Sequence, residues 1–158
     1  MKTFLNENQI KVLYRLEQTL RENDIPFIVI GGLASIAWGV NRPLVDIDIQ
    51  VSSSDLVRVN ELLGEYVSTD MRHYVTASWD INQMILTMDK VGIDVCGAED
   101  FYVVKDAERH LIKNCLDIAV VKDVAGISIP VLPKEVLIEY KKLIARPVDL
   151  QDIAQLES

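Results

Sequence analysis

The sequence predicts an α/β (α+β) domain in which helices flank a single mixed β-sheet. The apolar run 28–30 is typical of a strand that is buried on both faces. Gly31 and Gly32 follow it at once, and residues 33–38 then have the pattern of a short helix that ends at Gly39. Further strand and helix patterns alternate along the rest of the chain. No repeat, low-complexity tract or linker interrupts them.

Length and composition suit one globular domain over residues 1–158, with its core in 27–97 and C-terminal helices in 133–157. Apolar residues make up 49% of the chain, yet no run is long enough to cross a membrane. The start lacks the apolar segment of a signal peptide, so we expect a cytoplasmic protein without a membrane partner. The net charge of −8 argues against broad nucleic-acid binding.

The first helix is expected to start at Asn6, which can cap it, with Gln9 at the second position of a capping box. It should end near Asn23, before Pro26 introduces the first core strand. Its apolar stripe would pack on the sheet and consists of Ile10, Leu13, Leu16 and Leu20.

Further elements follow in the middle of the chain. Residues 56–63 have a helical apolar stripe that ends at Gly64. Residues 71–79 alternate loosely as a strand, and residues 84–88 form a stronger one. Residues 89–92 then predict a hairpin turn into another strand over 93–96.

The last third of the chain is harder to interpret. Residues 98–114 show no clear pattern, and we expect a loop with a short helix at most. Two short strands are predicted over 116–121 and 127–131. Pro133 then opens a helix at a favoured first-turn position, and Asp149 is expected to cap a last short helix.

The first two strands carry the residues most suited to chemistry. Gly31 and Gly32 permit a tight turn and a close backbone approach, with free helix N–H groups that favour an anion. Asp46 and Asp48 are two apart on a strand, so both side chains leave the same face. Such a pair repels itself unless a cation intervenes, and magnesium is the divalent ion that best suits oxygen ligands beside phosphates. The alternative is a tight turn beside two solvated carboxylates.

The Gly31-Gly32 pair, thirteen further residues, and then Asp46-Ile47-Asp48-Ile49 resemble the signature of the DNA polymerase beta-like nucleotidyltransferase superfamily. Within it, the similarity is to minimal bacterial nucleotidyltransferases, such as lincosamide nucleotidyltransferases and abortive-infection nucleotidyltransferase toxins. The resemblance implies the nucleotidyltransferase fold. It also implies metal-dependent transfer of a nucleoside monophosphate from a nucleoside triphosphate, ATP above all, to an acceptor hydroxyl. Asp46 and Asp48 would hold two magnesium ions, and Gly31 and Gly32 would hold phosphates.

The superfamily uses a third carboxylate from a neighbouring strand, and the segment Ile93-Asp94-Val95 resembles that element. Asp94 would then complete the metal site and accept the proton of the attacking hydroxyl. The alternative is an acid that reaches water at a sheet edge, and Asp89 is a competing candidate in the predicted turn. Arg42 would neutralise charge on the leaving pyrophosphate, or would instead pair with a surface acid.

The C-terminal segment from Lys142 to Ile153 is similar to the closing Lys…Arg-x-Lys-Asp-x-x-Asp element of many minimal nucleotidyltransferases. The gap between Lys142 and Arg146 is one residue shorter than in that element, and Val148 replaces a lysine. The roles of Lys142, Arg146, Asp149 and Asp152 therefore stay open between a site and an ordinary helix hairpin.

The sequence leaves the acceptor open among a small molecule, a protein and tRNA. The short chain has no evident acceptor domain, so a homodimer or a partner protein would be needed if the acceptor pocket lies at an interface. Two other functions compete with catalysis: a nucleotide-binding partner or antitoxin-like module of a toxin–antitoxin or defence system, and an inactive relative. For the isolated cysteines and histidines we expect packing or surface roles only; they are Cys96, Cys115, His73 and His110.

Overall fold

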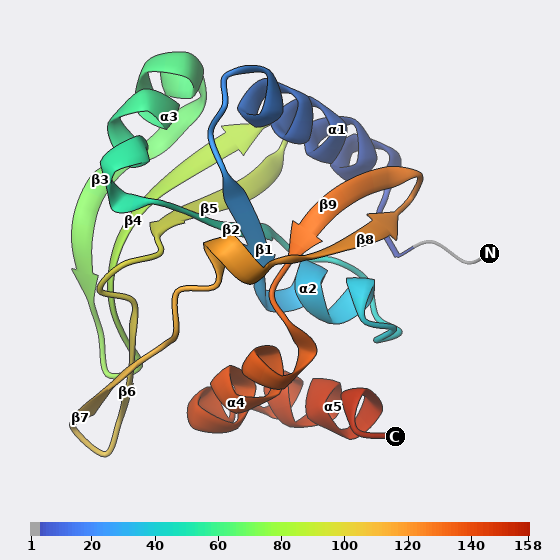
Figure 1. Cartoon of the computed structure of the whole chain (residues 1–158), viewed down its shortest axis with the longest axis vertical. Coiled ribbons are helices and arrows are strands. Elements are labelled where there is room, and N and C mark those ends of the chain that lie inside the picture. Colours follow the sequence, from blue (N-terminus) through green and yellow to red (C-terminus); the bar gives the residue numbers. More distant parts are fainter. Residues whose placement is uncertain (1–3) are drawn as a thin grey trace.

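One mixed β-sheet separates two groups of helices in the computed structural model, which describes residues 4–158 (Figure 1). Within these residues there are five α-helices, namely α1 (Glu7–Glu22), α2 (Gly31–Ala37), α3 (Leu56–Leu63), α4 (Lys134–Ile144) and α5 (Pro147–Leu156). The strands are β1 (Phe27–Ile30), β2 (Ile47–Val51), β3 (Val67–Val75), β4 (Trp79–Met88), β5 (Val91–Gly97), β6 (Tyr102–Lys105), β7 (Glu108–Leu111), β8 (Val120–Val124) and β9 (Ile127–Val131). The strand order is β7-β6-β4-β5-β2-β1-β9-β8, and β3 pairs with β4.

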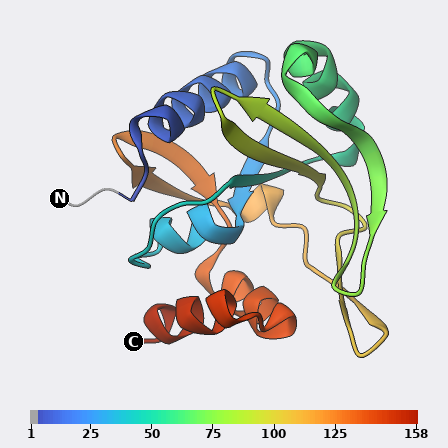
Figure 2. The same ribbon diagram turned by 180° about the vertical axis from the view of Figure 1, so that it is seen from behind.

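The two sides of the sheet differ in what covers them. Helices α1 and α3 lie on one side, whereas α2, α4 and α5 lie on the other, as both views show (Figures 1 and 2). Alternation along β2 buries Ile47 and Ile49 completely on one face and directs Asp48 to the opposite face. This architecture confirms the predicted α+β fold with a single mixed sheet.

Helix α1 begins as the sequence predicts. The Asn6 side chain accepts a hydrogen bond from the Gln9 N–H at 2.8 Å, and the Gln9 side chain accepts one from the Asn6 N–H at 2.9 Å. Gln9 is itself buried, and its amide also donates to the Leu44 carbonyl. The capping box therefore ties the helix to the segment that leads into β2. Within the described residues, no helix is both long and apolar enough to cross a membrane.

The pairing of the central strands sets the position of the acidic residues. β1 runs antiparallel to β2 and places Ile30 opposite Asp48. β2 runs parallel to β5 and places Asp48 opposite Asp94. Because paired residues in a sheet point to the same face, the two aspartates leave the sheet side by side.

The region 98–114 was wrongly predicted as a loop. It contains the hairpin β6–β7, in which Tyr102 pairs with Leu111 and Lys105 with Glu108. The turn uses Asp106 and Ala107, both with positive φ, and so lacks the glycine that usually marks such a turn. β7 is an edge strand with mostly exposed side chains, so it leaves no apolar alternation for the sequence to show.

The strand expected over 71–79 was placed too late. β3 ends at Val75, and Trp79 instead begins β4. The reversal depends on the Thr76 hydroxyl, which accepts hydrogen bonds from the backbone N–H groups of Ser78 and Trp79. A side-chain turn of this kind carries no glycine or proline signal. The other predicted strand and turn boundaries agree within a few residues, except that 116–118 is a 3-10 turn before β8.

Candidate active site

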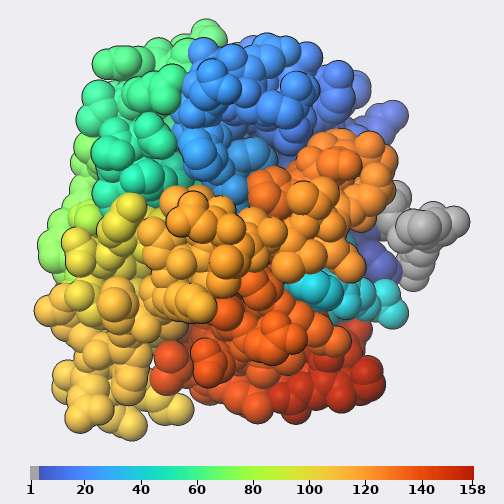
Figure 3. Space-filling view, viewed as in Figure 1, coloured from blue at the N-terminus to red at the C-terminus, as the bar shows by residue number. Residues whose placement is uncertain are grey.

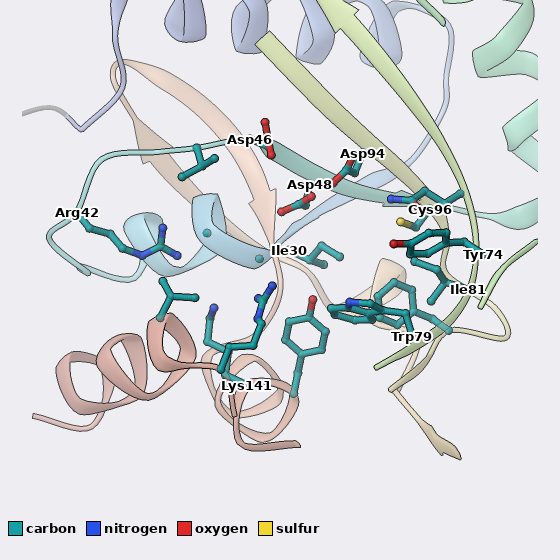
Figure 4. A pocket seen from close by; sticks show the side chains of 18 residues that line it. Ile30, Arg42, Asp46, Asp48, Tyr74, Trp79, Ile81, Asp94, Cys96 and Lys141 are labelled. Atoms are coloured by element: carbon teal, nitrogen blue, oxygen red, sulfur yellow. The ribbon is translucent and has the colours of Figure 1, made fainter. Parts of the chain in front are cut away.

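A pocket of about 380 Å³ lies between the sheet and the helices α2, α4 and α5. All the site residues that the sequence predicts line it together (Figure 4): Gly31, Gly32, Arg42, Asp46, Asp48 and Asp94. Asp89 is exposed in the β4–β5 turn and does not line this pocket. Asp94 therefore lies with the other predicted site residues, whereas Asp89 does not.

Asp48 and Asp94 form the acidic centre of the pocket. Burial raises the pKa of Asp48 well above its ordinary value, and a hydrogen bond with Asp94 and the charges of Asp94 and Asp46 raise it further. Burial, followed by the charge of Asp94, also raises the pKa of Asp46. These carboxylates therefore repel one another and favour either a shared proton or a cation.

Three glycines lie close to charged side chains of the pocket, in places where a larger residue would have too little space. Gly31 has a φ of +63°, and a Cβ atom there would lie 2.5 Å from Oδ2 of Asp48. At Gly92 a Cβ atom would lie 2.7 Å from Oδ1 of Asp46. At Gly32 it would lie 3.0 Å from Nη2 of Arg42. Each glycine thus leaves space for a charged side chain of the protein itself. The sequence instead suggests phosphate binding for Gly31 and Gly32 and a hairpin turn for Gly92.

The opposite wall carries a buried network of charges from α4 and α5. Nζ of Lys141 lies 2.9 Å from Oδ2 of Asp152 and 3.3 Å from Oδ1 of Asp149, and all three side chains are almost fully buried. Arg42 donates two hydrogen bonds to Asp152 at 2.7 and 2.8 Å. Arg146 donates to Asp149 from Nε at 2.7 Å and from its backbone N–H at 3.1 Å. Two carboxylates therefore hold three cations along this wall. Figure 4 labels two of the cations, Arg42 and Lys141.

The charges in this network stabilise one another. Burial alone would raise the pKa of Asp152, but hydrogen bonds from Arg42 and Lys141 outweigh it and hold that pKa below its usual range. The bond to Asp152 raises the pKa of Arg42, and the bond to Asp149 raises that of Arg146. Arg42 thus pairs with an acid that is buried beside the site, and the alternative of a surface acid is wrong.

Lys141, and not Lys142 as the sequence comparison suggests, is the lysine that contacts Asp149 and Asp152. Lys142 is exposed and pairs with Glu157 at 2.8 Å. The gap between Lys141 and Arg146 is one residue longer than the gap between Lys142 and Arg146, so it has the length expected for the C-terminal element. The phase of α4 could have shown this, because Leu137, Tyr140 and Lys141 share its buried face. Asp149 is also not the N-cap of α5: it lies in the first turn and accepts the N–H of Arg146, which occupies the cap.

An aromatic wall that the sequence did not predict completes the pocket. The Tyr140 ring lies 5.8 Å from that of Trp79 and 6.1 Å from that of Phe101. Burial and the charge of Asp48 raise the pKa of the Tyr140 phenol, so it stays protonated. These side chains come from α4, β4 and the segment before β6. Since they are far apart in sequence, no local pattern brings them together.

Both cysteines are packed in the interior, and His73 lies at the surface. Cys96 is buried against the pocket, where burial and the charges of Asp48 and Asp94 raise its pKa and keep it a neutral thiol. Cys115 is buried as well. His73 is exposed and hydrogen-bonds Asp80.

The acidic wall fits a hard divalent cation in its chemistry. Across residues 4–158, no three His, Cys, Asp or Glu side chains already form a compact ligand cluster. Asp48 and Asp94 nevertheless supply adjacent carboxylate oxygens whose repulsion a cation would relieve. Magnesium keeps several waters and needs few protein ligands, so a pair of this kind with Asp46 nearby suits it.

The comparisons with known proteins agree on the fold. No protein-family model matches the chain, and a comparison with curated protein sequences finds no match either. Among solved structures, TM1012 from Thermotoga maritima, a protein assigned as a nucleotidyltransferase, is similar with a TM-score of 0.77 at 19% identity, over 97% of this chain and 94% of that one.

Two antibiotic-modifying proteins are similar as well. The lincosamide antibiotic adenylyltransferase LnuA has a TM-score of 0.65 at 17% identity, over 99% of each chain. ANT(2")-Ia, solved with adenylyl-2"-tobramycin, has a TM-score of 0.62 at 14% identity, over 94% of this chain and 87% of that one. The fold that the glycine pair and the Asp-x-Asp strand imply is therefore confirmed, and the chain has the nucleotidyltransferase fold.

Proposed function

We propose that this chain is a metal-dependent nucleotidyltransferase, which moves a nucleoside monophosphate from a nucleoside triphosphate to the hydroxyl of an acceptor and releases pyrophosphate. ATP is the first donor to test. The observation that supports this best is the pair Asp48 and Asp94, side by side at one edge of a pocket whose opposite wall presents Arg42 and Arg146. Acidic oxygens and fixed guanidinium groups across one pocket suit a triphosphate and its metal.

The residues would divide the reaction between them. Asp46, Asp48 and Asp94 would hold two magnesium ions, which neutralise phosphate charge and lower the pKa of the acceptor hydroxyl. Arg42 and Arg146 would bind the triphosphate. Asp94 would accept the hydroxyl proton as the acceptor oxygen bonds to the α-phosphorus. The bond from that phosphorus to the bridging oxygen breaks, and its electrons leave with pyrophosphate.

The structural relatives indicate which acceptors to test first. LnuA was solved with lincomycin, and ANT(2")-Ia with adenylyl-2"-tobramycin. Hydroxyl-bearing small molecules of this kind are therefore the first acceptors to test with this chain. A protein and tRNA remain as further arms of the same screen.

Nucleotide binding tests the donor site without an acceptor. Calorimetry should show that ATP binds more tightly with magnesium than with a chelator, because the metal offsets the acidic wall. Asp48→Asn should abolish that difference. Equal affinity with and without magnesium in the native sequence would contradict the metal-dependent proposal.

Transfer itself is tested with ATP labelled at the α-phosphate and the acceptor screen. Asp94→Asn should lower transfer by roughly 10²- to 10⁴-fold, the usual contribution of a positioned general base, while nucleotide affinity changes much less. Asp89→Asn is the matched control and should transfer normally. Tight nucleotide binding without transfer to any acceptor would instead favour a nucleotide-binding module.

A further inference from the structure

A second hollow, of about 740 Å³, lies between the β6–β7 hairpin and α4. Figure 3 shows the two surfaces that border it, the hairpin in yellow at lower left and α4 in orange-red beside it. Tyr140 lines both this hollow and the candidate active site. None of the residues given catalytic or nucleotide-binding roles above lines the second hollow. It therefore needs an explanation of its own.

The second hollow is basic although the whole chain has a net charge of −8. Glu139 is the acidic residue among the described residues that line it. The basic residues there are Lys105, Arg109, His110, Lys113 and Lys142. A local excess of positive charge on an acidic protein attracts anions to that point.

The two lysines Lys105 and Lys113 have no acidic partner among the described residues. Arg109 pairs with Asp80 at 3.2 Å, and Lys142 pairs with Glu157. The side chains of Lys105 and Lys113 form no ion pair anywhere in residues 4–158, and both are exposed. Their ammonium groups are thus available to an anion in the hollow.

The base of the hollow is apolar. Ile112 and Tyr140 are 7% and 5% exposed, and Val136 and Leu143 are half-buried beside them. Leu111 also lines the hollow and is 63% exposed, which is high for a large apolar side chain. The hollow therefore combines an apolar base with cationic groups, so an anion alone would leave the apolar surface uncovered.

We propose that this second hollow binds a small amphipathic anion, namely an apolar ring or short chain that carries a carboxylate or a phosphate. The apolar part would lie on Ile112 and Leu143, and the anionic group would meet Lys105 and Lys113. The volume falls within the usual range of small-molecule sites. A nucleic acid is a poor fit, because the basic groups surround one concave site and form no extended face.

The test compares three probes of similar apolar size on the full chain: 3-phenylpropionate, 2-phenylethyl phosphate and the neutral 3-phenylpropan-1-ol. Binding is followed by amide chemical shifts in NMR, which also locate the site. The carboxylate probe, the phosphate probe or both should bind roughly tenfold more tightly than the alcohol, because a hydrogen bond to a charged group adds that much affinity. Shift changes should gather in residues 109–113 and 136–143. The stronger of the two anions identifies the headgroup.

Variants separate charge from shape. Lys105→Gln with Lys113→Gln should remove the preference for the anions, whereas Lys11→Gln with Lys90→Gln, two exposed lysines elsewhere, should keep it. Val136→Trp should fill the base and weaken all three probes, with folding checked by circular dichroism. The proposal is overturned if the alcohol binds as tightly as the anions, if the Lys105 and Lys113 variant keeps the preference, or if the shifts gather around Asp48. Absence of binding by both anions up to about 10 mM also overturns it.

Discussion

The carboxyl group of Asp48 is held where its ionised form is disfavoured. Burial, the hydrogen bond with Asp94 and the charges of Asp94 and Asp46 all raise its pKa. The native state therefore retains a proton that the unfolded chain releases. This contribution to stability is complete below the unfolded pKa, about 3.9, and is lost as the pH rises through the folded pKa.

Asp48→Asn should consequently stabilise the metal-free protein at neutral pH. We expect its melting temperature at about pH 7.5, with a chelator, to rise by roughly 2–4 °C, the shift that about 1 kcal/mol produces in a chain of this size. Near pH 3.5 the gain should disappear, since the carboxyl group of Asp48 is then mostly protonated in both the folded and the unfolded state. Asp89→Asn, at an exposed turn, is the control and should leave the profile unchanged. A gain that is equal at both pH values would contradict the argument.

Gly31 illustrates a second residue-scale constraint, and Gly126 provides its control. Both have positive φ, but a Cβ atom at Gly126 would meet nothing within 4 Å, whereas one at Gly31 would meet Asp48. Each change to Ala should cost about 1–2 kcal/mol of unfolding free energy for the backbone conformation. Gly31→Ala should lose roughly 1–3 kcal/mol more, from overpacking.

Denaturant titration measures this difference between the two glycines. Repeating Gly31→Ala in an Asp48→Ala background should recover most of the additional loss, because the contact is then gone. Equal losses at Gly31 and Gly126 in the native background would show that Asp48 moves aside at no cost.

At the scale of elements, the sequence predicts well where a local pattern decides the structure. The capping box of α1, the glycine stop of α3 and the buried strands β1 and β2 all have such patterns. The β6–β7 hairpin has none, because its turn and its edge strand are polar. The acidic half of the site lies on predicted strands. Its basic and aromatic half depends on how α4 and α5 pack, which the local sequence does not specify.

The α4–α5 hairpin offers a direct test of that packing. Lys141→Met leaves Asp149 and Asp152 buried with less positive charge, so we expect a loss of about 3–5 kcal/mol of unfolding free energy. The neighbouring change Lys142→Met removes an exposed ion pair and should cost no more than about 1 kcal/mol. Chemical denaturation of both variants provides the comparison. Similar losses would show that the buried contacts of Lys141 contribute no more to stability than the exposed ion pair of Lys142.

At the scale of the whole molecule, the sheet separates the helices into two groups. Helices α1 and α3 seal one face, and the face that carries Asp48 and Asp94 is left to α2, α4 and α5. The two hollows described above are both bordered by α4, and Tyr140 belongs to both. The C-terminal helices thus cover the face of the sheet that carries Asp48 and Asp94, and together with Arg42 they supply the cations of the pocket.

The pairing of Arg42 with Asp152 joins residues 110 positions apart, which has a consequence during translation. At about 5–20 residues per second, a ribosome needs roughly 5–22 s to add that much chain. For most of this interval the Gly31-Gly32 turn and strand β2 have been synthesised, whereas helices α4 and α5, which lie across the pocket from them in the folded protein, have not. The pocket therefore takes its observed form only after α5 has been synthesised, well after the strands that carry its acidic side chains.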